Sequence, residues 1–509
     1  MLARVAFTVL SLVLTLCFCL YGFNHYYLLR VSRRYASPRP SGIGSRRPRV
    51  AIHLPVYNER YVVRRLLHAC ARAAEAYGAD KVRIVIIDDS DDDTAEEVDR
   101  AAADYAGSRV RVEVLRRGQR QGFKAGALQL ALERSREPYI AVFDADFVPP
   151  ADFLAATIPH FLSDGRLGLV QSRWTHLNRE YNLLTRAIAI GIDVHFGIEQ
   201  AGRSAAGCFL TFNGSAGVFR REALVKAGGW QADTLAEDLD ASYRVQMNGY
   251  RAVYLKDPAI PAEVPPSVPS FKKQQARWAC GSLRTARKLL PALLSDRTIS
   301  LKNRLQAFIH LTNYLVHPLL LASFVLACLA SLFRMDSFDL VIAPALSPAA
   351  GIAAAIFQNL GWFSLVALIA LSMAAGLIYP IATLRAGKAS VWKNVPSLLV
   401  LFFLGCGFSL SNTIEAGKAL LTRRAWAFKR TPKYALQREG DAWKNKKYQV
   451  PLDLASLAEL ALIGLGLAAM GLAAGRANYG VLPVLAPYTA AFAFVFVLTI
   501  RQSRPENEG

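Results

Sequence analysis

Long apolar stretches without charged side chains are the feature that most constrains how this chain can fold. They cover residues 5–29, 309–333, 351–384, 395–414 and 477–500, with a shorter stretch at 460–475. A helix that crosses the hydrocarbon core of a bilayer needs about 20 such residues. Because the longer stretches reach that length, the sequence predicts a multi-pass integral membrane protein whose helices are surrounded by membrane lipids.

The basic residues are placed beside these apolar stretches. The chain has 60 Lys and Arg against 39 Asp and Glu, a formal net charge of +21, which by itself would suit nucleic acid. Residues 30–49 are rich in arginine, however, and residues 418–447 hold a second basic cluster. Positive charge that flanks apolar spans marks the cytoplasmic side of a membrane. The placement argues against nucleic acid as a partner and predicts a cytoplasmic polar domain attached to a plasma or inner membrane.

The same rule orders the membrane region. If residues 395–414 crossed the bilayer, the basic cluster at 418–447 would lie outside the cell, against the positive-inside tendency. We therefore expect residues 395–414 to form an interfacial or re-entrant segment, which leaves five spans. Six spans are the alternative.

The chain divides into parts of different composition. These are an N-terminal transmembrane helix at 1–29, a basic linker at 30–48, a polar domain at 49–294 and a transmembrane region at 295–509. In the polar domain, apolar strands such as VRIVIIDDS alternate with helical segments such as GFKAGALQLALERSRE. That alternation is typical of a mostly parallel sheet covered by helices, so the fold class is α/β plus an α-helical transmembrane region.

The polar domain ends in an amphipathic segment. From Pro266 to Leu294, lysines and arginines are interleaved with aromatic and aliphatic residues. A basic amphipathic helix with aromatic residues favours a position in the membrane interface. The alternative is a helix that packs only on its own domain.

Acidic pairs follow two of the predicted strands. Asp88 and Asp89 close VRIVIIDDS, and Asp144 and Asp146 close YIAVFDAD. Open α/β sheets bind ligands at the carboxyl ends of their strands. Mg²⁺ and Mn²⁺ prefer oxygen ligands and need few from the protein when phosphates complete the shell. Asp144 and Asp146 therefore predict a metal site that holds a diphosphate, whereas Asp88 and Asp89 would accept hydrogen bonds from a base or a ribose, or cap a helix.

Other polar residues complete a predicted site for a nucleotide-sugar. Tyr57 and Glu59 lie in the turn PVYNE, where the tyrosine ring can lie against a base. Lys124 can approach the nucleotide, or is a surface lysine at a helix start. Asp238, in LAEDLD, is the candidate general base, because inverting sugar transfer needs a carboxylate beside the acceptor hydroxyl. A helix N-terminal carboxylate is the alternative for Asp238.

A last group of residues predicts the acceptor side of the site. Arg277, in KKQQARWACGS, is a cation suited to a diphosphate, and the ring of Trp278 suits the apolar face of a pyranose. FNGSAG supplies small polar groups that let a sugar approach the backbone. The candidate acceptor-binding residues are Trp278, Asn213, Glu237 and Gln274.

At this point the motifs match a family. The order PVYNE, Asp88-Asp89, KAG, Asp144-x-Asp146, FNGSAG, Glu237-Asp238 and QQARW resembles the processive family 2 glycosyltransferases, those of cellulose and hyaluronan synthases. The chain is most similar to the cellulose synthase-like glucomannan and mannan synthases. The resemblance implies a GT-A fold, an inverting mechanism, Mg²⁺ or Mn²⁺, and a membrane channel for the growing polymer.

The resemblance also implies roles for single residues. It assigns nucleoside contacts to Asp88 and Lys124, the diphosphate and metal to Asp144 and Asp146, the general base to Asp238, the diphosphate clamp to Arg277, and acceptor stacking to Trp278.

A loop at 426–434 resembles the gating loop of these synthases, in which Thr431 and Lys433 would contact the diphosphate. A basic linker beside the membrane is the alternative. The chain departs from the family pattern at two positions. Arg430 stands where the family has a hydrophobic residue, and Ala236 stands where it usually has threonine.

The sequence thus favours a membrane enzyme that polymerises hexose from UDP-glucose or GDP-mannose and exports the polysaccharide. The alternative is a single-addition enzyme that glycosylates a membrane lipid, similar to ceramide or diacylglycerol glucosyltransferases. A transporter or scaffold with a degenerate catalytic domain is a third hypothesis, against which the intact Asp144, Asp146 and Asp238 argue.

Overall fold

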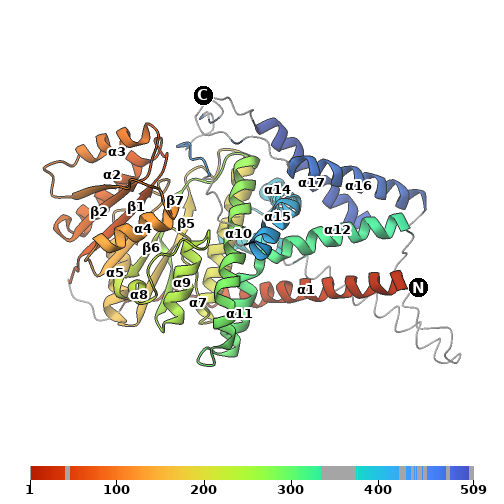
Figure 1. Ribbon diagram of the computed structural model, residues 1–509, viewed down its shortest axis with the longest axis horizontal. Helices are drawn as coiled ribbons and strands as arrows, with labels where there is room; N and C mark the ends of the chain where they lie inside the picture. Colours follow the sequence, from red (N-terminus) through yellow and green to blue (C-terminus); the bar gives the residue numbers. More distant parts are fainter. Residues whose placement is uncertain are drawn as a thin grey trace.

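The structure is a computed structural model of the full chain. It describes residues 2–40, 46–333, 374, 376–422, 431–436, 441, 443, 450, 455–476 and 482–503. A sheet domain lies at one end, and long helices extend away from it at the other (Figure 1).

A seven-stranded sheet forms the centre of the domain. Its strands are β1 (Val50–Val56), β2 (Val82–Asp88), β3 (Arg111–Arg116), β4 (Tyr139–Val142), β5 (Leu167–His176), β6 (Gly217–Arg220) and β7 (Arg251–Ala262). They lie in the order β3-β2-β1-β4-β6-β5-β7. Strand β6 is antiparallel to β4 and β5, and the other pairs are parallel. The predicted α/β class is confirmed, with one antiparallel strand in an otherwise parallel sheet.

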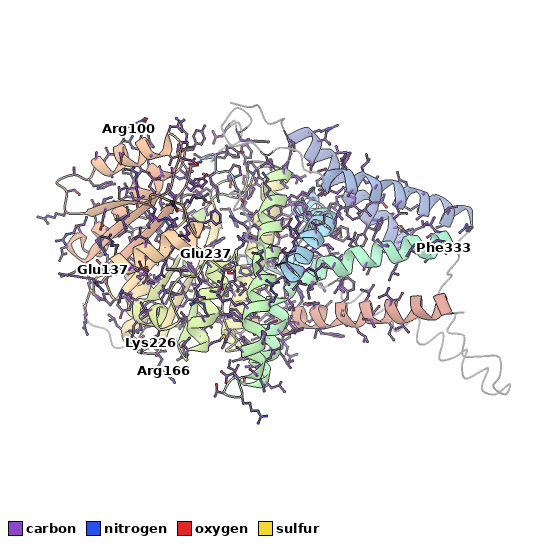
Figure 2. The ribbon with its side chains drawn as sticks, in the orientation of Figure 1. Arg100, Glu137, Arg166, Lys226, Glu237 and Phe333 are labelled. Atoms are coloured by element: carbon purple, nitrogen blue, oxygen red, sulfur yellow. The ribbon has the colours of Figure 1, made fainter. Side chains whose placement is uncertain are left out.

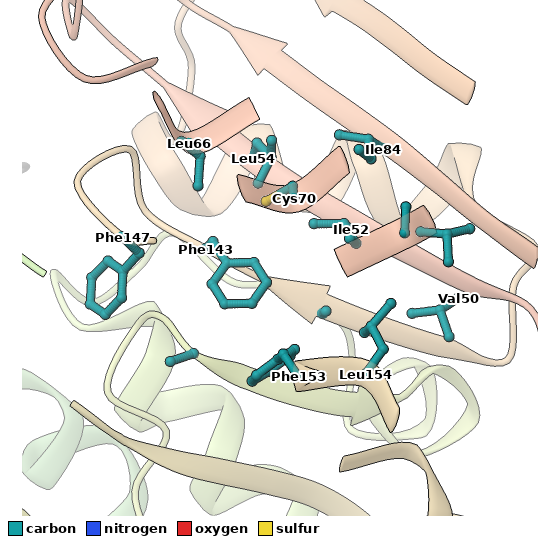
Figure 3. Packing of buried hydrophobic residues seen from close by; sticks show 14 of the residues in the cluster. Val50, Ile52, Leu54, Leu66, Cys70, Ile84, Phe143, Phe147, Phe153 and Leu154 are labelled. Atoms are coloured by element: carbon teal, nitrogen blue, oxygen red, sulfur yellow. The ribbon is translucent and has the colours of Figure 1, made fainter. Parts of the chain in front are cut away.

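Helices cover both faces of this sheet, as the continuous apolar strands require. They are α2 (Val63–Tyr77), α3 (Thr94–Ala103), α4 (Phe123–Arg134), α5 (Phe153–Ser163), α6 (Leu183–Val194), α7 (Ala201–Ala205), α8 (Arg221–Lys226) and α9 (Glu237–Met247). The largest buried cluster joins β1, β2 and β4 to α2 and α5 (Figure 3). In it, the rings of Phe143 and Phe153 meet edge to face with centroids 4.9 Å apart. The packing holds the end of β4, and with it the acidic pair, against α5.

Among the residues that the structure describes, four long helices are apolar enough to cross a membrane: α1 (Leu2–Ser32), α12 (Val316–Phe333), α16 (Ala455–Gly475) and α17 (Leu482–Gln502). Residues 395–414 fall in a further pair, α14 (Val395–Gly407) and α15 (Ser409–Leu421), which is bent by 41°. A broken span and a re-entrant loop both contain such a bend. The predicted span within 351–384 lies largely outside the described residues, so the count of five spans stays a prediction.

Helix α10 (Val268–Ser295) joins the two regions, and α11 (Leu301–Leu311) follows it. Pro269 in its first turn suits a helix start, where no backbone donor is lost. In Figure 1, α10 stands between the sheet domain and the apolar helices, and runs across the direction of those helices. Lys272 of α10 forms an ion pair of 2.6 Å with Glu459 of α16, with both side chains buried. The predicted amphipathic helix is present, and its location in the membrane interface stays a prediction.

We expect Phe143→Ala to destabilise the sheet domain. The ring is fully buried, and removing a buried phenylalanine side chain costs about 3–5 kcal/mol of unfolding free energy. Denaturant unfolding of the purified protein, followed by tryptophan fluorescence, measures the loss. Val225→Ala on α8 is the control, because that side chain is 46% exposed and such changes stay within about 0.5 kcal/mol. Equal losses in both variants would contradict the packing described.

Candidate active site

A cavity of about 180 Å³ lies at the carboxyl edge of the sheet, facing α10. The predicted site residues that line it come from segments throughout the chain. They are Tyr57, Glu59, Lys124, Asp144, Asp146, Asn213, Glu237, Asp238, Gln274, Arg277, Trp278, Thr431 and Lys433. The fold thus brings the predicted donor, metal and acceptor residues together around one space, although their individual roles stay predictions.

Asp88 is the predicted site residue that does not line this cavity. Its side chain is fully buried and accepts a hydrogen bond of 3.1 Å from Arg116. The next residue, Asp89, faces the cavity instead and is paired with Arg117, whose Nε lies 2.8 Å from Oδ1. Successive residues at a strand end point to opposite sides, so only one member of this pair can face the cavity.

The acidic pair after β4 is held by backbone and lysine contacts. The backbone N–H of Asp144 donates to Ser215 Oγ at 3.0 Å. Lys124, in the first turn of α4, places its Nζ 2.7 Å from Asp144 Oδ1. Lys433 places its Nζ 2.6 Å from Asp146 Oδ2. Both carboxylates therefore face cations at the cavity wall.

Lys124 connects this pair to the predicted general base. Its Nζ lies 3.4 Å from Glu237 Oε1 and donates to the carbonyl of Gly214 at 3.0 Å. Asp238 follows Glu237 in the first turn of α9, where a helix N-terminus favours negative charge. Burial, with the neighbouring Glu237 adding to it and Lys124 opposing it, raises the pKa of Asp238 to about 7. A carboxyl with such a pKa can exchange protons near neutral pH, as a general base must.

One face of α10 closes the cavity. Arg277 and Trp278 follow Gln274 by three and four residues, so both lie on the same side of the helix as Gln274. The helix approaches residues 235–236 closely, because a Cβ at Gly281 would lie 2.9 Å from the Cβ of Ala236. Ala236, one of the two positions at which the chain departs from the family pattern, is therefore packed against α10. The small residues at this crossing let α10 approach the start of α9, and Trp278 and Asp238 line the same cavity.

Sequence reasoning missed several residues of this wall. Arg120 stacks on Tyr57, with its guanidinium carbon 3.3 Å from the ring centroid, so the predicted base-stacking ring is covered by a cation. Trp174 and His176 line the cavity from β5, and Glu263 lines it just after β7. Glu263 follows a strand as the acidic pairs do, and the same rule could have found it.

Two further cavities follow the first, one adjoining it and the other adjoining the second. A cavity of about 430 Å³ shares lining residues with it, including Asp238 and Trp278. A cavity of about 280 Å³ shares His317, Leu401 and Gly405 with the second, and lies among residues of α1, α12 and α14. The three cavities lie in series from the sheet edge to the apolar helices.

Comparison with known families identifies the class of enzyme. A family model described as "Glycosyl transferase family 2" matches residues 51–224, and one described as "Glycosyl transferase family group 2" matches residues 139–379. The sheet domain and the helices that follow it are therefore similar in sequence to family 2 glycosyltransferases. The predicted GT-A class agrees with this domain and with its mixed sheet.

The curated relatives are glucomannan mannosyltransferases, so the predicted cellulose synthase-like resemblance is confirmed. Glucomannan 4-beta-mannosyltransferase 9 of Arabidopsis thaliana is 36% identical over 258 residues, which cover 50% of this chain and 48% of that protein. Probable glucomannan 4-beta-mannosyltransferase 4 of Oryza sativa subsp. japonica is 34% identical over 262 residues, 51% of this chain and 47% of that protein. The chain spans about half the length of the curated relatives it matches.

Solved structures of glycosyltransferases are also similar. The mannosyltransferase PcManGT from Pyrobaculum calidifontis, in complex with GDP-Man and Mn²⁺, has a TM-score of 0.49 and 22% identity, covering 75% of this chain and 96% of that chain. TarS of S. aureus has a TM-score of 0.36 and 14% identity, covering 69% of this chain and 54% of that chain.

We expect Gly214→Ala to lower sugar transfer by at least about tenfold, because a misplacement of about 1 Å can cost about a hundredfold in rate. A Cβ there would lie 2.9 Å from Asp238 Oδ2 and 3.2 Å from Lys124 Nζ, so both side chains must move. Release of nucleoside diphosphate measures the rate.

Gly249→Ala is the matched control. Gly249 has a φ of +82°, close to the +84° of Gly214, but a Cβ there meets nothing within 4 Å. Both variants share the backbone strain of a positive φ. Equal activity of Gly214→Ala and Gly249→Ala would contradict the claim that a side chain at position 214 displaces Asp238.

Proposed function

We propose that the chain is a membrane-embedded, inverting β-glycosyltransferase that adds hexose from a nucleotide-sugar to a growing polysaccharide and exports the product. The observation that carries the proposal is the junction of the first two cavities, which share Asp238 and Trp278. A base and an aromatic ring at this junction suit the place where an acceptor sugar meets the donor. The series of cavities toward the apolar helices supports an exit path for the chain.

The donor would lie on the side of the first cavity formed by the sheet edge. Tyr57 and Arg120 suit the base, and Arg277, Thr431 and Lys433 suit the diphosphate. UDP-glucose and GDP-mannose are the two candidate donors for such a site. The names of the curated relatives, glucomannan 4-beta-mannosyltransferases, favour GDP-mannose.

The residues at the acidic pair fit a divalent cation. Asp144 and Asp146 present carboxylate oxygens that already accept ammonium groups at 2.7 and 2.6 Å. Mg²⁺ and Mn²⁺ need few ligands from the protein when phosphates complete the shell, so two carboxylates suffice for such a site. When bound, Mg²⁺ or Mn²⁺ would neutralise the leaving diphosphate.

The chain's own residues would carry out the transfer. The carboxylate of Asp238 takes the proton from the acceptor hydroxyl, whose oxygen then attacks C1 of the donor sugar. The bond between C1 and the diphosphate oxygen breaks with inversion, and its electron pair leaves with the diphosphate. Trp278 orients the acceptor ring, and Lys124 keeps Glu237 and Asp144 from repelling the ionised base.

We expect Asp238→Asn to lower polymer synthesis by about 10²–10⁴-fold, because an amide cannot take the acceptor proton. Affinity for GDP and UDP should be unchanged. The measurement is incorporation of labelled sugar by the purified protein from GDP-mannose and UDP-glucose with Mn²⁺, followed by linkage and size analysis. Asp164→Asn is the control, since Asp164 pairs with Arg251 outside the cavity. Full turnover in Asp238→Asn would refute the assignment, and a single sugar on a lipid would favour the alternative function.

The pH profile should report the environment of Asp238. Because the base acts when ionised and its pKa is raised to about 7, kcat/KM should fall as pH drops below about 7 and level off above it. Glu237→Gln removes the like charge that helps raise this pKa, so the acidic limb should move to lower pH. Initial rates between about pH 5 and pH 9 test this. A shift to higher pH would contradict the electrostatic account.

A further inference from the structure

The contact between Lys433 and Asp146 places an ammonium group on the predicted metal ligand. Lys433 Nζ lies 2.6 Å from Asp146 Oδ2, and the Asp146 side chain is 2% exposed. Lys433 follows Asp146 by 287 residues in the sequence. A carboxylate buried this deeply needs a compensating positive charge, and the lysine supplies it in this arrangement.

The backbone beside Lys433 is anchored independently of that ion pair. The N–H of Tyr434 donates to Glu263 Oε2 at 3.2 Å, and Arg65 donates to the other oxygen of Glu263 at 2.7 Å. The side chains of Tyr434 and Leu436 are buried in one cluster with Trp443. The lysine side chain can therefore leave Asp146 while the backbone at 434 stays in place.

An ammonium group and a divalent cation compete for the same carboxylate oxygen. Mg²⁺ binds carboxylate oxygens at about 2.0–2.1 Å, so a cation on Asp146 Oδ2 would lie beside the lysine nitrogen now 2.6 Å from it. Two positive groups that close repel strongly in a buried site. Lys124 differs, because it also contacts Glu237 and the Gly214 carbonyl, which keep it in place if Asp144 takes a new partner.

We propose that Lys433 is a tethered competitor for the divalent cation, which keeps metal affinity low until a nucleoside diphosphate arrives. The proposal rests on the proposed function. A diphosphate supplies oxygen ligands to the cation and, at the same time, an anionic partner for the displaced ammonium group. Metal and nucleotide therefore bind cooperatively, and the free cation alone binds weakly.

The test is Mn²⁺ binding to the full-length protein in detergent, without sugar, measured by electron paramagnetic resonance. Lys433→Met should tighten Mn²⁺ binding by at least about fivefold, within the usual range of coupling between sites. It should also reduce the further tightening that added GDP or UDP produces. Lys433→Arg keeps the competing charge and should bind Mn²⁺ as the natural chain does.

Lys226→Met is the matched control. Lys226 forms an ion pair of the same length, 2.6 Å, with Glu222, and lies on the outside of the sheet domain away from Glu237 (Figure 2). Its Mn²⁺ affinity should be unchanged. Asp146→Asn should weaken binding, and thermal unfolding without Mn²⁺ verifies that each variant is folded.

Unchanged, weaker or undetectable Mn²⁺ binding in folded Lys433→Met would overturn the proposal, and so would tightening in Lys433→Arg. This outcome is separate from the proposed function, because the binding measurement needs no sugar transfer. Tighter Mn²⁺ binding by Lys433→Met, together with no transferase activity of the natural chain, would support the competitor and refute the proposed function. Polymer synthesis by the natural chain, together with unchanged Mn²⁺ binding by Lys433→Met, would do the reverse.

Discussion

Ammonium groups between carboxylates hold the acidic edge of this sheet together. Asp144, Asp146, Glu237 and Asp238 all line one cavity, and carboxylates this close cannot all ionise without compensation. Lys124 lies between Asp144 and Glu237, and a second lysine covers Asp146. These contacts join the end of β4 to the starts of α4 and α9. The positions of the predicted base and of the predicted metal ligands are therefore set by one electrostatic network.

Helix α10 connects the candidate site to the apolar helices. The face with Arg277 and Trp278 closes the cavity, while Lys272 pairs with Glu459 of α16. The backbone of Val268 also donates to Gln502 of α17 at 2.8 Å. Removing one member of a buried ion pair leaves an uncompensated charge, so the contact between Lys272 and Glu459 is costly to break. The site and the apolar helices thus both contact α10, and residues of this helix line the first two cavities.

Much of the site could be predicted from local patterns. Asp144 and Asp146 follow a buried strand, and Gln274, Arg277 and Trp278 share a helical spacing, so short sequence segments were enough to find them. Asp89 lines the cavity and Asp88 does not, because alternation along a strand does not say which residue faces the ligand edge. Arg120 was missed because its contact with Tyr57 joins two turns that are far apart in sequence.

The sequence by itself determined the class of fold, the apolar helices and the chemical groups of the candidate site. Each of these follows from residue types at fixed local spacing: continuous apolar runs, acidic strand ends and a helical QQARW motif. Only the tertiary structure decided which cation neutralises which carboxylate, that Asp89 and not Asp88 lines the cavity, and that the first two cavities adjoin at Asp238. Those features depend on contacts between distant segments, such as the ion pair of Asp146 and Lys433, which are 287 residues apart in the sequence. Contacts of that kind leave no local pattern.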